Sequence, residues 1–115
     1  MTYYYPQGSL VFATDPTGAH TNPRPVIVIS DGDRPYVDQE ATVVCLTTQT
    51  EYSSDVTRVP DAVLEGVELR KTSYVMPWAI YTIPLSSIRD ALPSGTITTD
   101  GIRLVADAID TMIRP

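Results

Sequence analysis

The chain has 115 residues, one cysteine and a net charge of −6, and these facts exclude several classes of protein. This length fits one domain with a real core, so we expect a single domain over residues 1–115 with its core at about 8–113. One cysteine and one histidine leave neither an internal disulfide nor a zinc pattern. With no apolar run of membrane-spanning length and no signal-peptide pattern, we expect a cytoplasmic protein that does not enter a membrane.

The chain is acidic, and its charged residues are mainly Asp and Arg, with very little Lys. Ten Asp accompany seven Arg and a single Lys. This bias favours a halophilic source, where an acidic surface keeps proteins soluble, although an ordinary acidic protein is the alternative. An acidic surface argues against long-range attraction of nucleic acid in dilute salt. In molar salt the Debye length is only about 3 Å, so local contacts would decide binding.

The first third of the chain predicts two strands joined by a short loop. Residues 8–14 form the first strand, and Asp15-Pro16-Thr17-Gly18 has Pro and Gly where a turn needs them. The loop continues through His20, the only histidine. Residues 25–29 are uncharged and mostly β-branched, which predicts a strand buried on both faces.

Arg24 stands at the entrance of that second strand, between Pro23 and Pro25. Each proline restricts its own φ and favours extended backbone in the residue before it, so Arg24 projects from a stiff segment. A charge fixed at the mouth of a core strand is costly unless it meets an anion. That anion is either a bound ligand or the carboxylate of a nearby Asp, and the sequence leaves both open.

The middle of the chain predicts further short strands. Residues 42–47 are a third, largely apolar strand that runs into Thr48 and Gln49. Residues 56–59 alternate like an edge strand before a proline. Residues 61–70 predict a loop with one apolar anchor. Residues 72–83 predict a long strand interrupted at Met76-Pro77, where the proline requires an edge position or a bulge.

The C-terminal third predicts the only convincing helix. Residues 84–92 allow at most one or two helical turns, and residues 93–95 a turn. Thr98 or Thr99 then caps a helix with Asp100 in its first turn. Its apolar stripe has the three-and-four spacing of a packed face and consists of Ile102, Val105, Ile109 and Met112, widened by Ala106 and Ile113. We therefore predict a mainly β (α+β) fold, a small, strongly curved antiparallel sheet with a C-terminal helix.

Few residues of the chain suit catalysis. Carboxylates are scattered, no nucleophile turn of the Gly-x-Ser-x-Gly type occurs, and no phosphate-binding glycine loop is present. What remains is an anion site without a metal, made of Arg24 at the mouth of one strand and of Thr47, Thr48 and Gln49 at the end of a neighbouring strand. If the second and third strands pair antiparallel, Arg24 and the Thr47-Thr48 pair fall at the same end of the sheet, and a guanidinium with hydroxyls suits a phosphodiester. The alternative is that threonine is simply common in strands.

Three segments together resemble the MazF/PemK toxins of toxin–antitoxin systems. They are Asp15-Pro16-Thr17 after the first strand, Arg-Pro-Val-Ile-Val-Ile-Ser at 24–30, and Cys-Leu-Thr-Thr-Gln at 45–49. The later order also fits, because Ser73-Tyr74-Val75 opens the long strand and Gly-Thr-Ile-Thr at 95–98 leads into the last helix. The resemblance spans almost the whole chain, from residue 8 to residue 113.

This resemblance implies an SH3-like barrel of the MazF/PemK/CcdB type that forms a homodimer and binds a cognate antitoxin protein. It implies a sequence-selective endoribonuclease (mRNA interferase) that cleaves single-stranded RNA through a 2′,3′-cyclic phosphate, with no metal, no cofactor and no direct action on DNA. Arg24 matches the catalytic arginine of the family and Thr47 its catalytic threonine. Thr48 and Gln49 lie beside them as candidates to bind the phosphate or a flanking base, and Thr17 is a further substrate-binding candidate.

The chain departs from the family pattern at two places. The loop before the arginine is shorter than usual, and where relatives often carry a glutamate the nearest titratable group is His20, a substitute proton acceptor. On the long strand Trp78 and Tyr81 stand where relatives carry polar or basic residues. They can stack on an unpaired base, but Trp78 also suits the core, which we favour, and Tyr81 the rim.

Two other functions suit the same barrel. One is a CcdB-like toxin that inhibits a protein target. The other is a regulatory binding module that keeps the fold and has lost cleavage. The ribonuclease is the leading interpretation, and these two functions are its alternatives.

Overall fold

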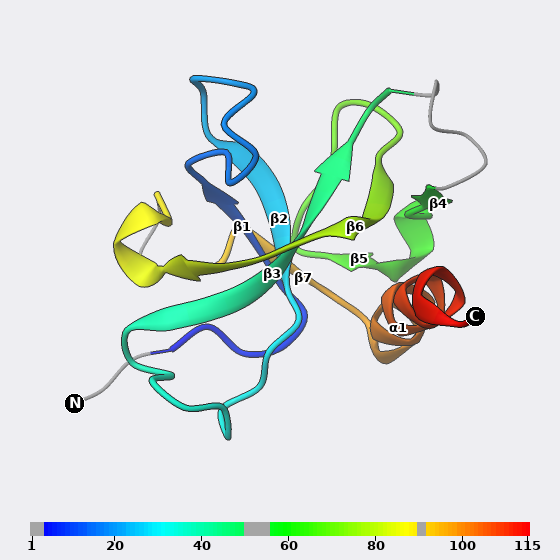
Figure 1. Ribbon diagram of the computed structural model, residues 1–115. Helices are drawn as coiled ribbons and strands as arrows, with labels where there is room; N and C mark the ends of the chain where they lie inside the picture. The colour runs from blue at the N-terminus through cyan, green and yellow to red at the C-terminus, as the bar shows by residue number, and fades with distance from the viewer. Residues whose placement is uncertain (1–3, 50–55, 90–91) are drawn as a thin grey trace.

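The computed structural model describes residues 4–49, 56–89 and 92–115, which form a curled antiparallel sheet with one long helix (Figure 1). The strands are β1 (Ser9–Ala13), β2 (Arg24–Val28), β3 (Glu40–Thr47), β4 (Thr57–Arg58), β5 (Leu64–Glu65), β6 (Tyr74–Pro84) and β7 (Gly95–Ile97). The helix is α1 (Thr99–Ile113), and single 3₁₀ turns, η1 and η2, occupy Asp61–Val63 and Leu85–Ser87. The predicted mainly β fold with a C-terminal helix is confirmed.

The strands make one seven-stranded sheet in the order β4-β6-β3-β2-β1-β7-β5, and every pairing is antiparallel. The long strands β3 and β6 cross the centre of the molecule, and the sheet curls around them into a half-barrel (Figure 1). The predicted edge strand before Pro60 is confirmed, because β4 is the last strand on one side.

Alternation along the central strands separates two cores. In β2, Val26 and Val28 face one cluster, which contains Tyr5, Val11, Val43 and Ile88. Between them Ile27 faces the other cluster, which contains Val44, Val75 and Val105 of α1. Successive residues of a strand point to opposite faces. The helix therefore covers only one face of the sheet, and the end of the other face is left for a site.

Strand β6 carries a bulge at the predicted place. Val44 of β3 pairs with Ile80, but Leu46, two residues on, pairs with Val75. The extra residues of β6 include Pro77, which has no N–H to give to the ladder. The predicted interruption at Met76-Pro77 thus takes the form of a bulge inside one continuous strand.

The predicted loop over residues 61–70 is wrong in part. It contains η1 and the short strand β5, which pairs with β7, a strand that the sequence did not reveal. The two strands approach closely because Gly95 has no side chain: a Cβ there would lie 2.5 Å from Val67 Cγ1 and 2.7 Å from the Glu65 carbonyl. Strands of two or three residues are too short to show a period.

Helix α1 begins at the predicted cap and ends at Ile113, the last residue of the predicted apolar stripe. Thr98 is the N-cap, and its hydroxyl accepts a hydrogen bond from the Gly101 N–H at 3.1 Å. Val105 is buried, whereas Met112 and Ile113 are 42% and 65% exposed. The last turn of the predicted stripe is therefore largely exposed, and Met112 lines a groove together with Trp78 of β6. Among the described residues no helix combines the length and hydropathy needed to cross a bilayer.

The cap of α1 provides a test of the helix boundary. Thr98→Ala should lower the free energy of unfolding by about 1 kcal/mol, because the Gly101 N–H loses its acceptor. Thr99→Ala is the matched control, since Thr99 is exposed inside the first turn and alanine favours helix there. Urea unfolding followed by circular dichroism measures both, and equal losses in the two variants would contradict the assigned cap.

Candidate active site

The loop between β1 and β2 is organised by Asp15, whose side chain is 5% exposed. Its Oδ1 accepts hydrogen bonds from the Thr17 N–H at 2.9 Å and the Thr17 hydroxyl at 2.7 Å. Its Oδ2 accepts from the His20 N–H at 3.0 Å and lies 2.8 Å from His20 Nδ1. The predicted turn is present, with Gly18 at φ +75° and its N–H bonded to the Asp15 carbonyl at 3.0 Å.

The carboxylate of Asp15 is ionised at neutral pH. Burial by itself would raise its pKa, but the hydrogen bonds from Thr17 and His20 favour the charged form and outweigh burial, so the pKa of Asp15 is lowered. One buried charge with four contacts thus fixes the position of His20 relative to the end of β1.

The pairing of β2 with β3 brings the two main candidates together. Val26 pairs with Cys45, and the same register continued two residues outward puts Arg24 opposite Thr47. Residues directly opposite each other in an antiparallel pair share a face. On the other side Arg24 pairs with Ala13, the last residue of β1. The expectation that Arg24 and Thr47 lie at one end of the sheet is met.

Arg24 makes no hydrogen bond or ion pair with any other described residue. The alternative in which it closes a salt bridge to a nearby Asp is therefore not found among those residues. The nearest carboxylate of the loop, Asp15, is occupied by Thr17 and His20. The guanidinium keeps its donors for a ligand.

Thr47 is held so that its proton is available. The residue is 8% exposed, and its Oγ1 accepts a hydrogen bond from the Gln49 N–H at 3.1 Å. A hydroxyl that already accepts one bond still has its own hydrogen to donate. Arg24 and Thr47 thus present donors on adjacent strands, which is the pattern that an anionic oxygen requires.

These side chains line one open cleft of about 490 Å³. Seven of the eight predicted site residues contribute to it, namely Thr17, His20, Arg24, Thr47, Gln49, Trp78 and Tyr81. Thr48 does not line the cleft, because neighbours in an extended segment point to opposite sides. Its role in substrate binding stays a prediction. In the described parts of the chain no cluster of three potential metal ligands occurs.

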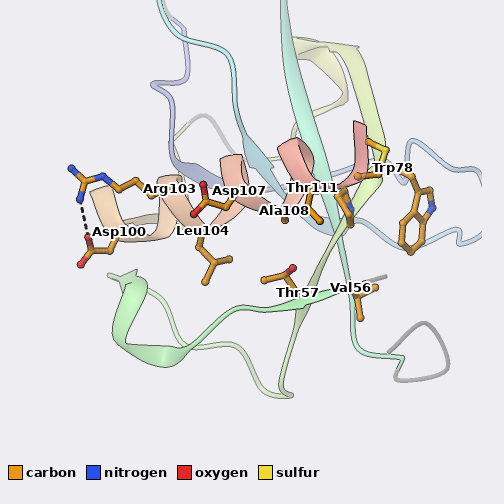
Figure 2. A pocket seen from close by; sticks show the side chains of 11 residues that line it. Val56, Thr57, Trp78, Asp100, Arg103, Leu104, Asp107, Ala108 and Thr111 are labelled. Atoms are coloured by element: carbon orange, nitrogen blue, oxygen red, sulfur yellow. Dashed lines mark hydrogen bonds and ion pairs between the residues drawn. The ribbon is translucent and has the colours of Figure 1, made fainter. Parts of the chain in front are cut away.

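Trp78 is 45% exposed, so the favoured core position for it is wrong. It lines the cleft and also a groove of about 760 Å³ that runs along α1. Figure 2 shows Trp78 at one end of this groove, with Leu104 and Ala108 of α1 along it and Thr57 facing them. Trp78 belongs to the bulged part of β6 and borders both hollows.

Six residues that line the cleft were missed as site residues, namely Asp15, Ala19, Cys45, Leu46, Met76 and Ala79. Asp15 was assigned only to the turn, although its position five residues before the only histidine was a signal for the contact. Met76 and Ala79 reach the cleft because of the bulge, and no local pattern predicts that.

Cys45 also borders the cleft, but its thiol is not poised for chemistry. Burial, and next the charge of Asp15, raise the pKa of Cys45 to about 11. The thiolate fraction at pH 8 is then about one thousandth, and the residue is 4% exposed.

We expect an aromatic disulfide reagent to label native Cys45 at least about a hundredfold more slowly than in urea. Equal rates, measured by absorbance, would contradict the buried environment.

The sequence matches no family model and no curated protein. The structure is similar to solved structures of MazF proteins. MazF from Deinococcus radiodurans superposes with a TM-score of 0.71 at 17% identity, over 96% of this chain and 97% of that one. The Mycobacterium tuberculosis toxin MazF-mt6 gives 0.66 at 23% identity, over 90% and 93%.

An endoribonuclease from a mycobacterial species, solved in complex with its cognate antitoxin, gives a TM-score of 0.69 at 17% identity, over 92% of this chain and 91% of that one. At such identities the likeness concerns the fold, and it extends over nearly the full length of both chains. The chain has the fold of the MazF toxins.

Proposed function

We propose that this chain is the toxin of a toxin–antitoxin system and cleaves single-stranded RNA without a metal or cofactor. One observation carries the proposal: Arg24, without a described partner, and the Thr47 hydroxyl lie opposite each other at an open cleft. The fold shared with MazF toxins supports the same assignment.

The arrangement suits transfer of a phosphoryl group to a neighbouring hydroxyl. When the ribose 2′-oxygen attacks phosphorus, negative charge grows on the equatorial oxygens of the phosphorane. The guanidinium of Arg24 and the hydroxyl of Thr47 are donors fixed on strands, so they need little reorganisation to meet that charge. Loss of one such donor typically costs about 3–4 kcal/mol of transition-state stabilisation.

His20 is the proposed proton acceptor. Arginine is a poor base, whereas an imidazole accepts protons near neutral pH, and His20 lines the same cleft. The 2′-oxygen forms its bond to phosphorus as the bond to the 5′-oxygen breaks, which leaves a 2′,3′-cyclic phosphate.

The remaining residues of the cleft are proposed to hold the RNA. Trp78 and Tyr81 offer faces on which unpaired bases can stack. Gln49, Thr17 and the neighbouring Thr48 offer groups that hydrogen-bond a phosphate or a base edge. Readout of bases at these positions would make cleavage sequence-selective.

The proposed partners are an antitoxin protein and a second copy of this chain. The mycobacterial endoribonuclease of the same fold is bound to its cognate antitoxin. A segment of such a protein lying in the cleft would hide Arg24. Exposed apolar side chains, among them Trp78, Met112 and Ile113, supply surface for a homodimer.

The catalytic pair is tested by two substitutions. Arg24→Ala and Thr47→Val should each lower kcat by about a thousandfold, because each removes a donor to the phosphorane. The measurement is cleavage of labelled single-stranded RNA in EDTA, in dilute and in molar salt. Arg58→Ala is the matched control, since Arg58 is exposed on β4 and lies outside the cleft.

The same experiment separates the rival functions. Intact RNA together with growth arrest on expression would favour a CcdB-like toxin that binds a protein target. Intact RNA without growth arrest would favour the regulatory module. Full activity in both Arg24→Ala and Thr47→Val would contradict the proposed chemistry.

Stacking by Trp78 makes a separate prediction. Trp78→Ala should raise KM by about 5- to 150-fold, which corresponds to the 1–3 kcal/mol of one base stacked on an aromatic side chain. The change in kcat should be smaller, since the indole is not expected to touch the reacting phosphate. Ile80→Ala is the control on the same strand, exposed but outside the cleft. An unchanged KM would remove Trp78 from the RNA path.

A further inference from the structure

One carboxylate oxygen of Asp15, Oδ2, holds the His20 ring in place. The Oδ2 atom accepts from the His20 backbone N–H at 3.0 Å and lies 2.8 Å from Nδ1. The other oxygen of the carboxylate is satisfied by the two donors of Thr17. The imidazole is 49% exposed, and its Nε2 makes no hydrogen bond with a described residue. One ring nitrogen is therefore anchored and the other is open.

The anchor decides which nitrogen carries the hydrogen in the neutral ring. An ionised carboxylate can only accept, so the 2.8 Å contact requires a hydrogen on Nδ1. The neutral imidazole then has its lone pair on Nε2. From this geometry we infer that Asp15 is a positioning residue that holds His20 in the tautomer able to take a proton at Nε2.

This inference rests on the proposed ribonuclease function and adds the path of the proton. The 2′-hydroxyl gives its proton to His20 Nε2, the 2′-oxygen bonds to phosphorus, and the bond to the 5′-oxygen breaks. The leaving 5′-oxygen takes a proton from solvent water, and the imidazolium later returns its proton to solvent. Asp15, fixed at Nδ1, stabilises the positive ring while it exists.

The surroundings of the ring contain few other groups that titrate. The charged or titratable side chains that share the cleft with the pair are Arg24 of β2, Cys45 of β3 and Tyr81 of β6. Cys45 stays protonated because its pKa is raised to about 11. In the part of the chain that the structure describes, Asp15 is thus the one carboxylate that lines the cleft.

Asp15→Asn tests the pair directly. The amide can keep its oxygen toward Thr17. Its NH₂ then loses the hydrogen bond from the His20 backbone N–H and donates to Nδ1, which moves the ring hydrogen to Nε2. We expect kcat to fall by about 10²–10⁴-fold and the rise of activity with pH to be lost. Nitrogen-15 spectra of the imidazole should report the Nδ1–H tautomer in the wild type and the Nε2–H tautomer in Asp15→Asn.

Two further variants keep the test decisive. Asp31→Asn removes the same charge from an exposed turn, where Asp31 accepts from the Asp33 N–H at 2.9 Å, and should leave the rate and the tautomer unchanged. If Asp15 acts through His20, then adding Asp15→Asn to His20→Gln should slow cleavage no further. A further loss in that double variant would show that Asp15 supports the loop rather than the base, and would overturn the inference.

The outcomes also separate this inference from the proposed function. If the wild type cleaves RNA and Asp15→Asn keeps its rate, its pH profile or its tautomer, the inference is wrong and the ribonuclease stands. If the wild type cleaves no RNA, the proposed function is wrong and the base role is overturned with it. The tautomer spectra then still decide whether the pair exists.

Discussion

The pairing of β2 with β3 is the constraint on which the candidate site depends. Val26 opposite Cys45 fixes Arg24 opposite Thr47, and a slip of one residue would turn one of the two side chains to the face that α1 covers. Both strands bury apolar residues on both faces, so a slip of one residue would also exchange the side chains of the two cores. Packing of the core therefore fixes the strand register, and the register places Arg24 and Thr47. The two side chains need no contact with each other to be positioned.

Long sequence patterns predicted the fold and the site better than short ones did. The two prolines beside Arg24, the β-branched run after it and the antiparallel pairing were enough to predict the convergence with Thr47. The pairing of β5 with β7 was not predictable, since each strand is too short to show a period. The core position favoured for Trp78 was wrong, because burial alternates along β6 and places the indole on the exposed side, between the buried Pro77 and Ala79.

The charge of the chain affects how it would hold RNA. Among the described residues that line the cleft, Arg24 is the only Arg or Lys, and Asp15 adds a negative charge that Cys45 also experiences. One phosphate contact gives a salt slope of only about −0.7 for a single strand. Stacking is far less sensitive to salt, and each base is worth about 1–3 kcal/mol. A cleft with one cation and two accessible aromatic side chains thus suits a binder that relies on stacking, which agrees with a net charge of −6.

The two halves of the cleft differ in rigidity, and this has a mechanistic consequence. Arg24 and Thr47 belong to strands inside the sheet, whereas His20 belongs to a loop and is 49% exposed. A base on a loop would ordinarily lose precision, and proton transfer requires hydrogen-bond reach. Here the loop is tied at four points to a single buried carboxylate next to the end of β1. Because β1 pairs with β2 at Ala13 and Arg24, the carboxylate proposed to orient the base and the guanidinium proposed to meet the phosphate are positioned by the same pair of strands.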